Sequence, residues 1–410
     1  MKEEPAIDRI IKTLINKYLY VIGLFVVLLA AVLIRASLAP NTELSPDYNT
    51  YYKAWVDFYR SAGGLKGLES APGDYYVPFN VLYALCSYVP FEPWVMLSII
   101  PTICEMITAF FIYRIFYHLT KVRFFSAVAG LLTLFLPFVV FNGSLWKQVD
   151  SVYTCFLVIS LHELIRGKYR VSLIWYSVSF AFKLQAVIFL PLFVILYFIG
   201  GFKGSEKKEF SILEFLWIPA VYLLAGLPEV LAGHGLRATY LAYFNQTGEI
   251  SSEGYGMVSF FPNLYNLGFD NYDKVLTGAA LLLVFAVLVA ILCLCVKYKD
   301  NIDDSTFIYL YIWTGWTCLM LLPGMHERYD YAMLIMLTPF ALLVRKRIVW
   351  PMLIANLCSL AVYAIVLFKA GEIGMPVISV AYTIAYLMTT VDIVRLLVGG
   401  DTGFEAKKSL

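Results

Sequence analysis

The sequence of 410 residues is poor in charged side chains, which make up only 15% of it, whereas hydrophobic residues make up 60%. Soluble proteins contain about 25% charged and about 45–50% apolar residues, so this composition excludes an ordinary soluble protein. A net charge of only +2 also excludes a surface that binds nucleic acid. Together with a mean hydropathy of +0.75, the composition predicts a polytopic protein that lies in a lipid bilayer.

Cysteine and histidine are few, and their positions do not suit a metal site. The seven cysteines show no metal-ligand spacing, so we expect seven buried thiols without disulfides. Only four histidines are present, and no second histidine follows His326-Glu327 at helical spacing, which excludes a zinc motif there. We therefore expect that the protein requires no cofactor.

Apolar runs recur along the whole chain. A spanning helix needs about 20 apolar residues, and the sequence predicts twelve such spans in one all-α unit that comprises residues 1–410. No small-residue cleavage site follows the first apolar run, so we expect it to be retained as a helix. The predicted spans cover residues 18–39, 94–119, 124–142, 151–165, 171–182, 186–200, 212–232, 276–296, 305–322, 330–344, 348–368 and 376–398.

Lys and Arg residues indicate the orientation of the chain. With a cytoplasmic N-terminus, 20 of the 31 basic residues fall in inner segments, ten fall outside and Arg114 lies within a span. This asymmetry predicts that both termini are cytoplasmic. The two long segments, residues 40–92 and 233–275, then form the first and second large extracytoplasmic loops. In the first loop, an aromatic stretch over residues 48–59 predicts an interfacial helix. Residues 76–90 are too short to cross the bilayer, so we expect them to be interfacial or re-entrant.

Two polar constellations follow predicted spans on the outer side. Asp47 lies just beyond the first span, where its carboxylate is either a general base or the N-cap of a helix. The segment Trp146-Lys147-Gln148-Val149-Asp150-Ser151 combines a ring, a cation and hydrogen-bonding side chains, which suit a sugar phosphate. The alternative for this segment is that Asp150 or Ser151 only caps the next helix.

Two further constellations contain cations. Phe182-Lys183-Leu184-Gln185 interrupts a long apolar stretch, so Lys183 either binds an anion or extends to the membrane interface. The turn Met325-His326-Glu327-Arg328-Tyr329-Asp330 places an arginine where it can bind phosphate through two hydrogen bonds, with a salt-bridged turn as the alternative. Glu105, inside the second span, is expected to pair with a cation, with a place in a cavity wall as the alternative.

These segments resemble the GT-C superfamily of integral-membrane glycosyltransferases, and are most similar to a bacterial branch of it. The likeness covers most of the chain and rests on Asp47, on Trp146, Gln148 and Asp150-Ser151, on Phe182-Lys183 with Gln185, and on His326-Glu327-Arg328-Tyr329. Members move a sugar from a polyprenyl-phosphate carrier to a glycan, lipid-linked or protein acceptor. The resemblance implies a plasma-membrane bundle of about 12 transmembrane helices, with an extracytoplasmic active site and interfacial helices in a large first loop.

The resemblance also implies roles for individual residues. Asp47 would be the general base of an inverting displacement. The donor phosphate would be bound by Arg328, Lys183, His326 and Lys147. The sugar or acceptor would be bound by Trp146, Gln148, Asp150, Gln185, Glu327, Tyr48, Asp74 and Trp55.

The chain departs from the family pattern in two places. Many members carry two adjacent acidic residues in the first loop, but Asp47 has no adjacent carboxylate, which argues against a divalent metal there. Lys147 occupies the middle of the Trp-x-Gln motif, where the family has a small residue. The alternatives to this family are a flippase or transporter of a lipid-linked sugar, and a glycan polymerase or ligase that uses a diphosphate-linked donor.

Overall fold

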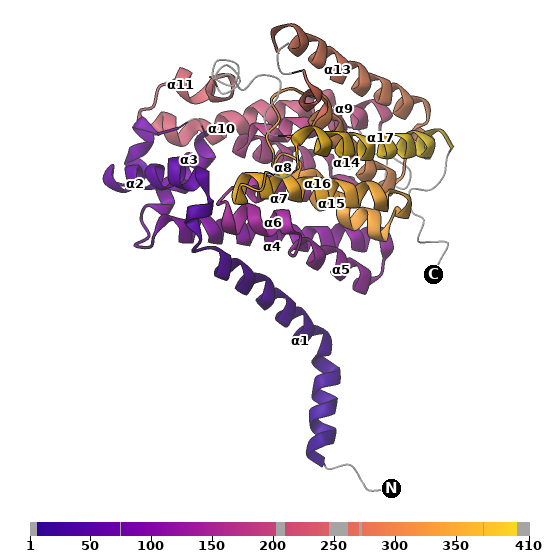
Figure 1. Ribbon diagram of the computed structural model, residues 1–410, viewed down its shortest axis with the longest axis horizontal. Helices are drawn as coiled ribbons and strands as arrows, with labels where there is room; N and C mark the ends of the chain where they lie inside the picture. The colour runs from indigo at the N-terminus through magenta and orange to yellow at the C-terminus, as the bar shows by residue number, and fades with distance from the viewer. Residues whose placement is uncertain are drawn as a thin grey trace.

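The computed structural model describes residues 6–73, 75–201, 210–245, 261–269, 273–371 and 373–399. Within these residues the secondary structure is helical, and no β-strand is present. Figure 1 shows most helices running along one direction through a single bundle, from which α1 (Ala6–Leu38) projects. The other helices are α2 (Lys53–Ser61), α3 (Val77–Cys86), α4 (Pro93–Thr120), α5 (Arg123–Thr133), α6 (Pro137–Val140), α7 (Asp150–Ile165), α8 (Tyr169–Phe182), α9 (Leu190–Ile199), α10 (Trp217–Ala232), α11 (Leu236–Tyr240), α13 (Asp273–Lys297), α14 (Asp304–Leu321), α15 (Tyr331–Leu343), α16 (Val349–Phe368) and α17 (Met375–Gly399).

Several helices have the length and apolar composition of membrane spans. Six helices in the described part of the chain meet both conditions, and α5 with residues 137–145 makes a seventh if this pair, bent by 50°, is one span. The protein is therefore an all-helical, multi-pass membrane protein. Each of the predicted spans coincides with a helical segment, but the total of twelve stays a prediction. The six helices are Ile7–Leu38, Pro93–Thr120, Ile212–Ala232, Leu276–Lys297, Lys346–Phe368 and Met375–Gly399.

Three helices lie inside the bundle, where no face needs to contact lipid. In α14 every residue from Ser305 to Leu321 is buried, and α7 and α15 are buried along most of their length. Because neighbouring helices surround α14, several of its polar side chains have hydrogen-bond partners within the protein. The indole of Trp313 donates to Thr390 at 2.9 Å, and the hydroxyls of Thr317 and Tyr386 lie 3.1 Å apart. This burial is consistent with the absence of α14 from the helices that have both the length and the apolar composition of a span.

Helix α5 packs closely on α4 because a glycine lies at their contact. A Cβ atom placed on Gly130 would lie 2.4 Å from the backbone oxygen of Ala109. Small residues at such positions let two membrane helices approach each other. The same region contains a buried ion pair, in which the Arg35 guanidinium of α1 donates to the Glu105 carboxylate of α4 at 2.5 Å. The prediction that Glu105 pairs with a cation is confirmed.

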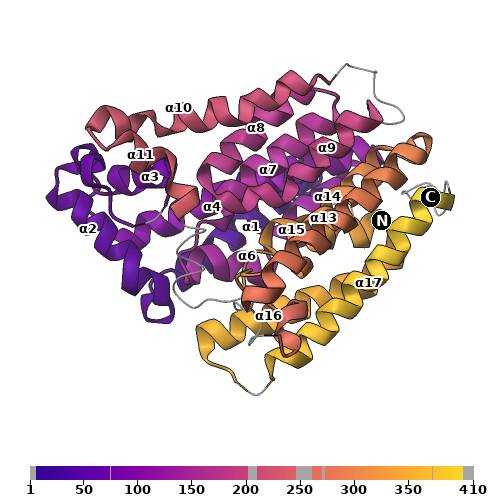
Figure 2. The ribbon, with the colours of Figure 1, turned by 90° about the horizontal axis from the view of Figure 1, so that it is seen from above.

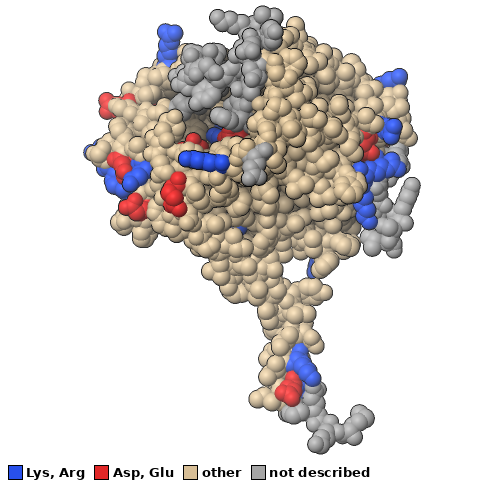
Figure 3. All heavy atoms as spheres, in the orientation of Figure 1, with Lys and Arg blue, Asp and Glu red and all other residues tan. Residues whose placement is uncertain are grey.

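The segment between α1 and α4 folds over one end of the bundle. Figure 2 shows α2, α3 and α11 gathered at that end, with the end of α17 at the other. Residues 48–61 are helical as predicted, and the short apolar piece forms α3. Lys and Arg gather at the opposite end, in the loops that follow α4, α7, α13 and α15, and Figure 3 shows basic side chains on that edge.

The cysteines are unpaired, as expected, but two of them are not buried. All seven are free thiols, and five of them are buried. Cys293 is exposed on α13, and Cys104 is half-buried on α4. The prediction of seven buried thiols was therefore wrong for these two, because an apolar run in a membrane helix faces lipid as readily as it faces protein.

Candidate functional site

A cavity of about 1040 Å³ opens at the end of the bundle that α2, α3 and α11 cover. Its lining comes from the first loop, from Trp146 between α6 and α7, from the break between α8 and α9, from α10 and α11, from the turn between α14 and α15, and from α16. Acidic and basic side chains lie at the floor of the hollow in Figure 3. Segments far apart in the sequence therefore meet here, and most of the predicted site residues are among them.

Asp47 faces this cavity from the first loop. Its carboxylate Oδ2 accepts a hydrogen bond from the indole Nε1 of Trp146 at 2.8 Å and another from the amide of Gln148. The side chain does not cap the helical segment that starts at Tyr48; instead, the hydroxyl of Ser45 accepts from the backbone N–H of Tyr48 at 3.1 Å. The alternative interpretation of Asp47 as an N-cap was therefore wrong. Since both bonds use Oδ2, Oδ1 is the oxygen that remains for a ligand.

Gln148 lies behind Asp47 and holds it in place. The hydroxyl of Tyr52 donates to Oε1 of Gln148 at 3.1 Å, and Tyr75 lies 3.1 Å from the same hydroxyl. Burial raises the pKa of Tyr52 well above its ordinary value, with the neighbouring Tyr75 and Asp47 adding to the effect, so the hydroxyl remains a donor. This chain of hydrogen bonds fixes the carboxylate of Asp47 relative to the cavity wall.

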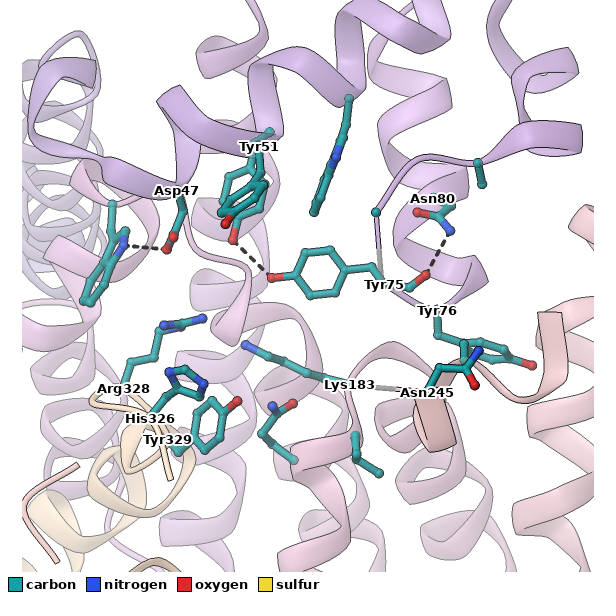
Figure 4. A pocket seen from close by; sticks show the side chains of 18 of the residues that line it. Asp47, Tyr51, Tyr75, Tyr76, Asn80, Lys183, Asn245, His326, Arg328 and Tyr329 are labelled. Carbon is teal, nitrogen blue, oxygen red and sulfur yellow. Dashed lines mark hydrogen bonds between the residues drawn. The ribbon is translucent and has the colours of Figure 1, made fainter. Parts of the chain in front are cut away.

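Two cations lie opposite Asp47. Figure 4 shows Arg328 and Lys183 extending toward each other from different segments, below Asp47. Lys183 directly follows α8 and is only 4% exposed, and its ammonium pairs with the carboxylate of Asp150. The alternative in which Lys183 extends to the membrane interface was therefore wrong. Arg328 stacks over the ring of Trp146, 5.5 Å from its centroid.

Asp150 is the buried carboxylate that connects the two cations. It is fully buried, and its oxygens also contact Nδ2 of Asn142 at 2.8 Å and Nε of Arg328 at 3.5 Å. The side chain makes no capping bond to α7, so the alternative role as a cap is not observed. A sugar does not reach Asp150 directly, because this residue lies behind Lys183 and does not line the cavity.

The turn between α14 and α15 combines a salt bridge with a cavity wall. The guanidinium Nη1 of Arg328 pairs with Glu327, and His326 Nδ1 lies 3.5 Å from the same carboxylate. Burial alone would raise the pKa of Glu327, but the charge of Arg328 and the hydrogen bond from His326 lower it to about 2. Among the described residues, none accepts from Nη2 of Arg328, so these two N–H groups remain for a ligand.

Aromatic rings form the wall between these polar groups and the mouth of the cavity. Tyr51, Tyr52, Trp55 and Tyr75 all line it. The ring of Trp55 lies 5.6 Å from that of Tyr52 and 5.5 Å from that of Tyr75, measured between centroids. Aromatic side chains with a few polar groups are typical of small-molecule sites. Trp55 is therefore in a position to contact a ligand, as predicted.

Not every predicted residue lines the cavity. Lys147 is fully buried, and its ammonium donates to the backbone oxygens of Ala39, at 2.7 Å, and Ser144. Its φ of 64° turns the side chain away from the cavity, in a conformation that a small residue adopts more readily. Burial lowers the pKa of Lys147 to about 8, although Glu43 opposes the shift. The prediction that Lys147 binds phosphate is therefore corrected.

The prediction that Tyr48 binds the sugar or acceptor is also corrected. Tyr48 is buried and does not line the cavity, whereas Tyr51 and Tyr52 do. Asp74 lies outside the described residues. The predicted residues that do line the cavity are Asp47, Trp55, Trp146, Lys183, Gln185, His326, Glu327 and Arg328.

A further carboxylate, that of Glu229, lines the cavity and was not predicted from the sequence. Glu229 of α10 is only 3% exposed; it accepts from Nδ2 of Asn80 at 2.7 Å and lies 3.5 Å from the hydroxyl of Thr239. His234 and Asn245 line the same region. The signal that pointed to Lys183, an ionisable residue inside an apolar stretch, also marks Glu229 and would have found it.

Comparisons with known proteins do not place the chain in a family. No protein-family model matches it, and no curated protein is similar to it. Within the described residues, no three His, Cys, Asp or Glu side chains are arranged to hold a metal ion.

Proposed function

We propose that the protein is an inverting glycosyltransferase that uses a polyprenyl-phosphate sugar as its donor. The observation that carries this proposal is the placement of one carboxylate, Asp47, opposite a pair of cations, Arg328 and Lys183, in one cavity. Sugar transfer from a phosphate carrier needs a base for the acceptor and positive charge for the leaving phosphate. Both requirements are present at the end of the bundle that the charge pattern predicts to be extracytoplasmic.

The transfer would proceed in one step. The oxygen of an acceptor hydroxyl forms a bond to the anomeric carbon, while the bond from that carbon to the phosphate oxygen breaks. Asp47 accepts the hydroxyl proton, and the polyprenyl phosphate departs with the electron pair. The phosphate changes from a diester with one negative charge to a monoester whose second pKa is about 6, so it needs no proton donor. Attack from the face opposite the leaving group inverts the anomeric configuration.

Arg328 and Lys183 would stabilise the charge that grows on the phosphate. Their carboxylate partners, Glu327 and Asp150, orient them before the substrate arrives, and preorganised donors of this kind lower a barrier by up to about 3–4 kcal/mol each. His326 lines the same cavity and offers a further ring nitrogen to the phosphate.

The test of the proposal is a transfer assay with purified protein. The protein is incubated with a panel of radiolabelled polyprenyl-phosphate sugars and with a membrane extract that supplies acceptors, and the label is followed out of the donor lipid. We expect one sugar to move to a water-soluble product or to a new lipid. Absence of transfer from every donor in the panel, with the folded protein present, would contradict the proposal.

Asp47→Asn gives the sharper test, because the amide oxygen can still accept from Trp146 and Gln148. We expect folding and donor binding to be retained and transfer to fall by about 10²–10⁴-fold, as for removal of a general base. Asp57→Asn is the matched control, because Asp57 lies in the same loop but forms an exposed pair with Arg60 at 2.9 Å. Near-normal transfer by Asp47→Asn would show that Asp47 is not the general base, whereas absence of transfer by the wild-type protein would favour the flippase of a lipid-linked sugar.

A further inference from the structure

A groove of about 510 Å³ lies between α16 and α17, at the end of the bundle opposite the cavity. Its floor includes Ile384, Leu387, Met388 and Val391 of α17, which recur every three or four residues and therefore share one face of the helix. These side chains are between 43% and 53% exposed. Both helices have the length and composition of membrane spans, so the groove opens toward the hydrocarbon of the bilayer.

Two arginines stand at one end of this apolar floor. Arg395 follows Val391 by one helical turn, and Arg347 comes from the turn that precedes α16. Both side chains belong to exposed residues. Their positions place positive charge where the lipid-facing floor reaches the basic end of the bundle.

A carboxylate also lines the groove, but its charge is already matched. Asp392 accepts two hydrogen bonds from the buried Arg345, at 2.8 and 2.9 Å, and a third from the hydroxyl of Tyr309 at 3.1 Å. A pair of this geometry neutralises the carboxylate and holds it toward the protein interior. Apart from Asp392, the charged side chains of described residues that line the groove are those of the two arginines.

We propose that this groove binds an anionic glycerophospholipid, with the headgroup phosphate between Arg347 and Arg395 and an acyl chain along the exposed face of α17. The apolar floor favours a lipid over a soluble phosphate, because a free phosphate would gain nothing from Leu387 and its neighbours. Basic pockets between membrane helices at the positively charged end bind acidic headgroups through the same combination of charge and apolar contact. This site is separate from the cavity and does not depend on the proposed transferase activity.

Native mass spectrometry of the full-length protein in detergent tests the site. The protein is titrated with phosphatidylglycerol and with phosphatidylcholine of the same acyl chains. We expect phosphatidylglycerol to bind more tightly, and Arg347→Gln with Arg395→Gln to lower this preference by about 30-fold, which corresponds to about 1 kcal/mol for each arginine. Lys299→Gln with Lys346→Gln is the matched control, because these two cations lie at the same end but do not line the groove.

Two further measurements test whether the site recognises the whole lipid or only its phosphate. Met388→Trp should fill the floor and weaken phosphatidylglycerol binding, and glycerol 3-phosphate at millimolar concentration should fail to displace the lipid. Equal binding of the two phospholipids, or an unchanged preference in the double arginine variant, would overturn the proposal. Displacement by glycerol 3-phosphate together with normal binding to Met388→Trp would also overturn it, since the site would then recognise a soluble phosphate.

Discussion

The buried pair of Lys183 and Asp150 supports a prediction that separates stability from ligand binding. Lys183 is 4% exposed and Asp150 is fully buried, so each charge depends on the other. Lys183→Met keeps most of the side-chain volume and removes the ammonium. Asp150→Asn removes the carboxylate charge and keeps the shape. The two single variants and the double variant form a thermodynamic cycle.

The expected energies follow from the contacts of each group. Removing one partner of a buried pair costs about 3–5 kcal/mol, because the other charge stays buried without compensation. We expect about 3 kcal/mol for Lys183→Met, the lower end, because Asp150 keeps its contact with Arg328 at 3.5 Å and its bond from Asn142 at 2.8 Å. The double variant leaves neither charge unpaired, so its loss should be smaller than the sum of the single losses by about 2–3 kcal/mol.

The free energy of unfolding is measured by SDS titration in detergent micelles, followed by tryptophan fluorescence. The affinity for the donor lipid is measured on the same four proteins. If Lys183 also binds the donor phosphate, the double variant should recover stability without recovering donor affinity. The matched control is the cycle of Arg35→Met with Glu105→Gln, a buried pair that does not line the cavity in the described part of the chain. This cycle should show coupling in stability and no change in donor affinity.

Two results would refute the reasoning. Strictly additive losses would show that the two charges do not stabilise each other in the membrane protein. Recovery of donor affinity in the double variant would show that Lys183 acts only through Asp150 and does not contact the phosphate.

Three further predictions follow from the structure. Arg328→Ala should raise the KM for the donor at least tenfold. Arg328→Lys should restore the wild-type KM only in part, since one ammonium cannot replace the two N–H groups of Nη2. Equal kinetics of wild type and Arg328→Ala would contradict this role. The pKa of Glu327 is about 2 in the folded protein and 4.5 ordinarily, so its ionised carboxylate stabilises the fold by about 3 kcal/mol above pH 4.5, and this stabilisation is lost as the pH falls toward 2. Glu327→Gln should therefore have a lower free energy of unfolding than wild type at pH 7, and the difference should disappear at pH 2 to 3. Parallel pH profiles of the two proteins would be inconsistent with this role of Glu327. In a protein without other cysteines, the Lys66→Cys variant should react with an impermeant maleimide on intact cells, and the Lys299→Cys variant should not. The reverse pattern would contradict the predicted orientation of the chain.

The sequence by itself determined the class of the protein and the general position of the site. Hydropathy is a property of each segment alone, so the apolar runs could be recognised as helices without knowledge of their neighbours. Asp47, Lys183 and Arg328 were predictable because a charged residue next to an apolar run in a membrane protein is costly without a function or a partner.

The tertiary structure alone decided which side chains face the cavity. Tyr48 and Tyr52 lie four residues apart, on nearly the same face of their helical segment, yet only Tyr52 lines the cavity. The φ of 64° at Lys147 turns this cation toward backbone oxygens, and no local pattern of sequence distinguishes it from Lys183. Glu229 joins the same cavity from α10 through contacts with residues more than a hundred positions away. Such contacts depend on how the helices pack, because burial and charge pairing arise between segments and not within one.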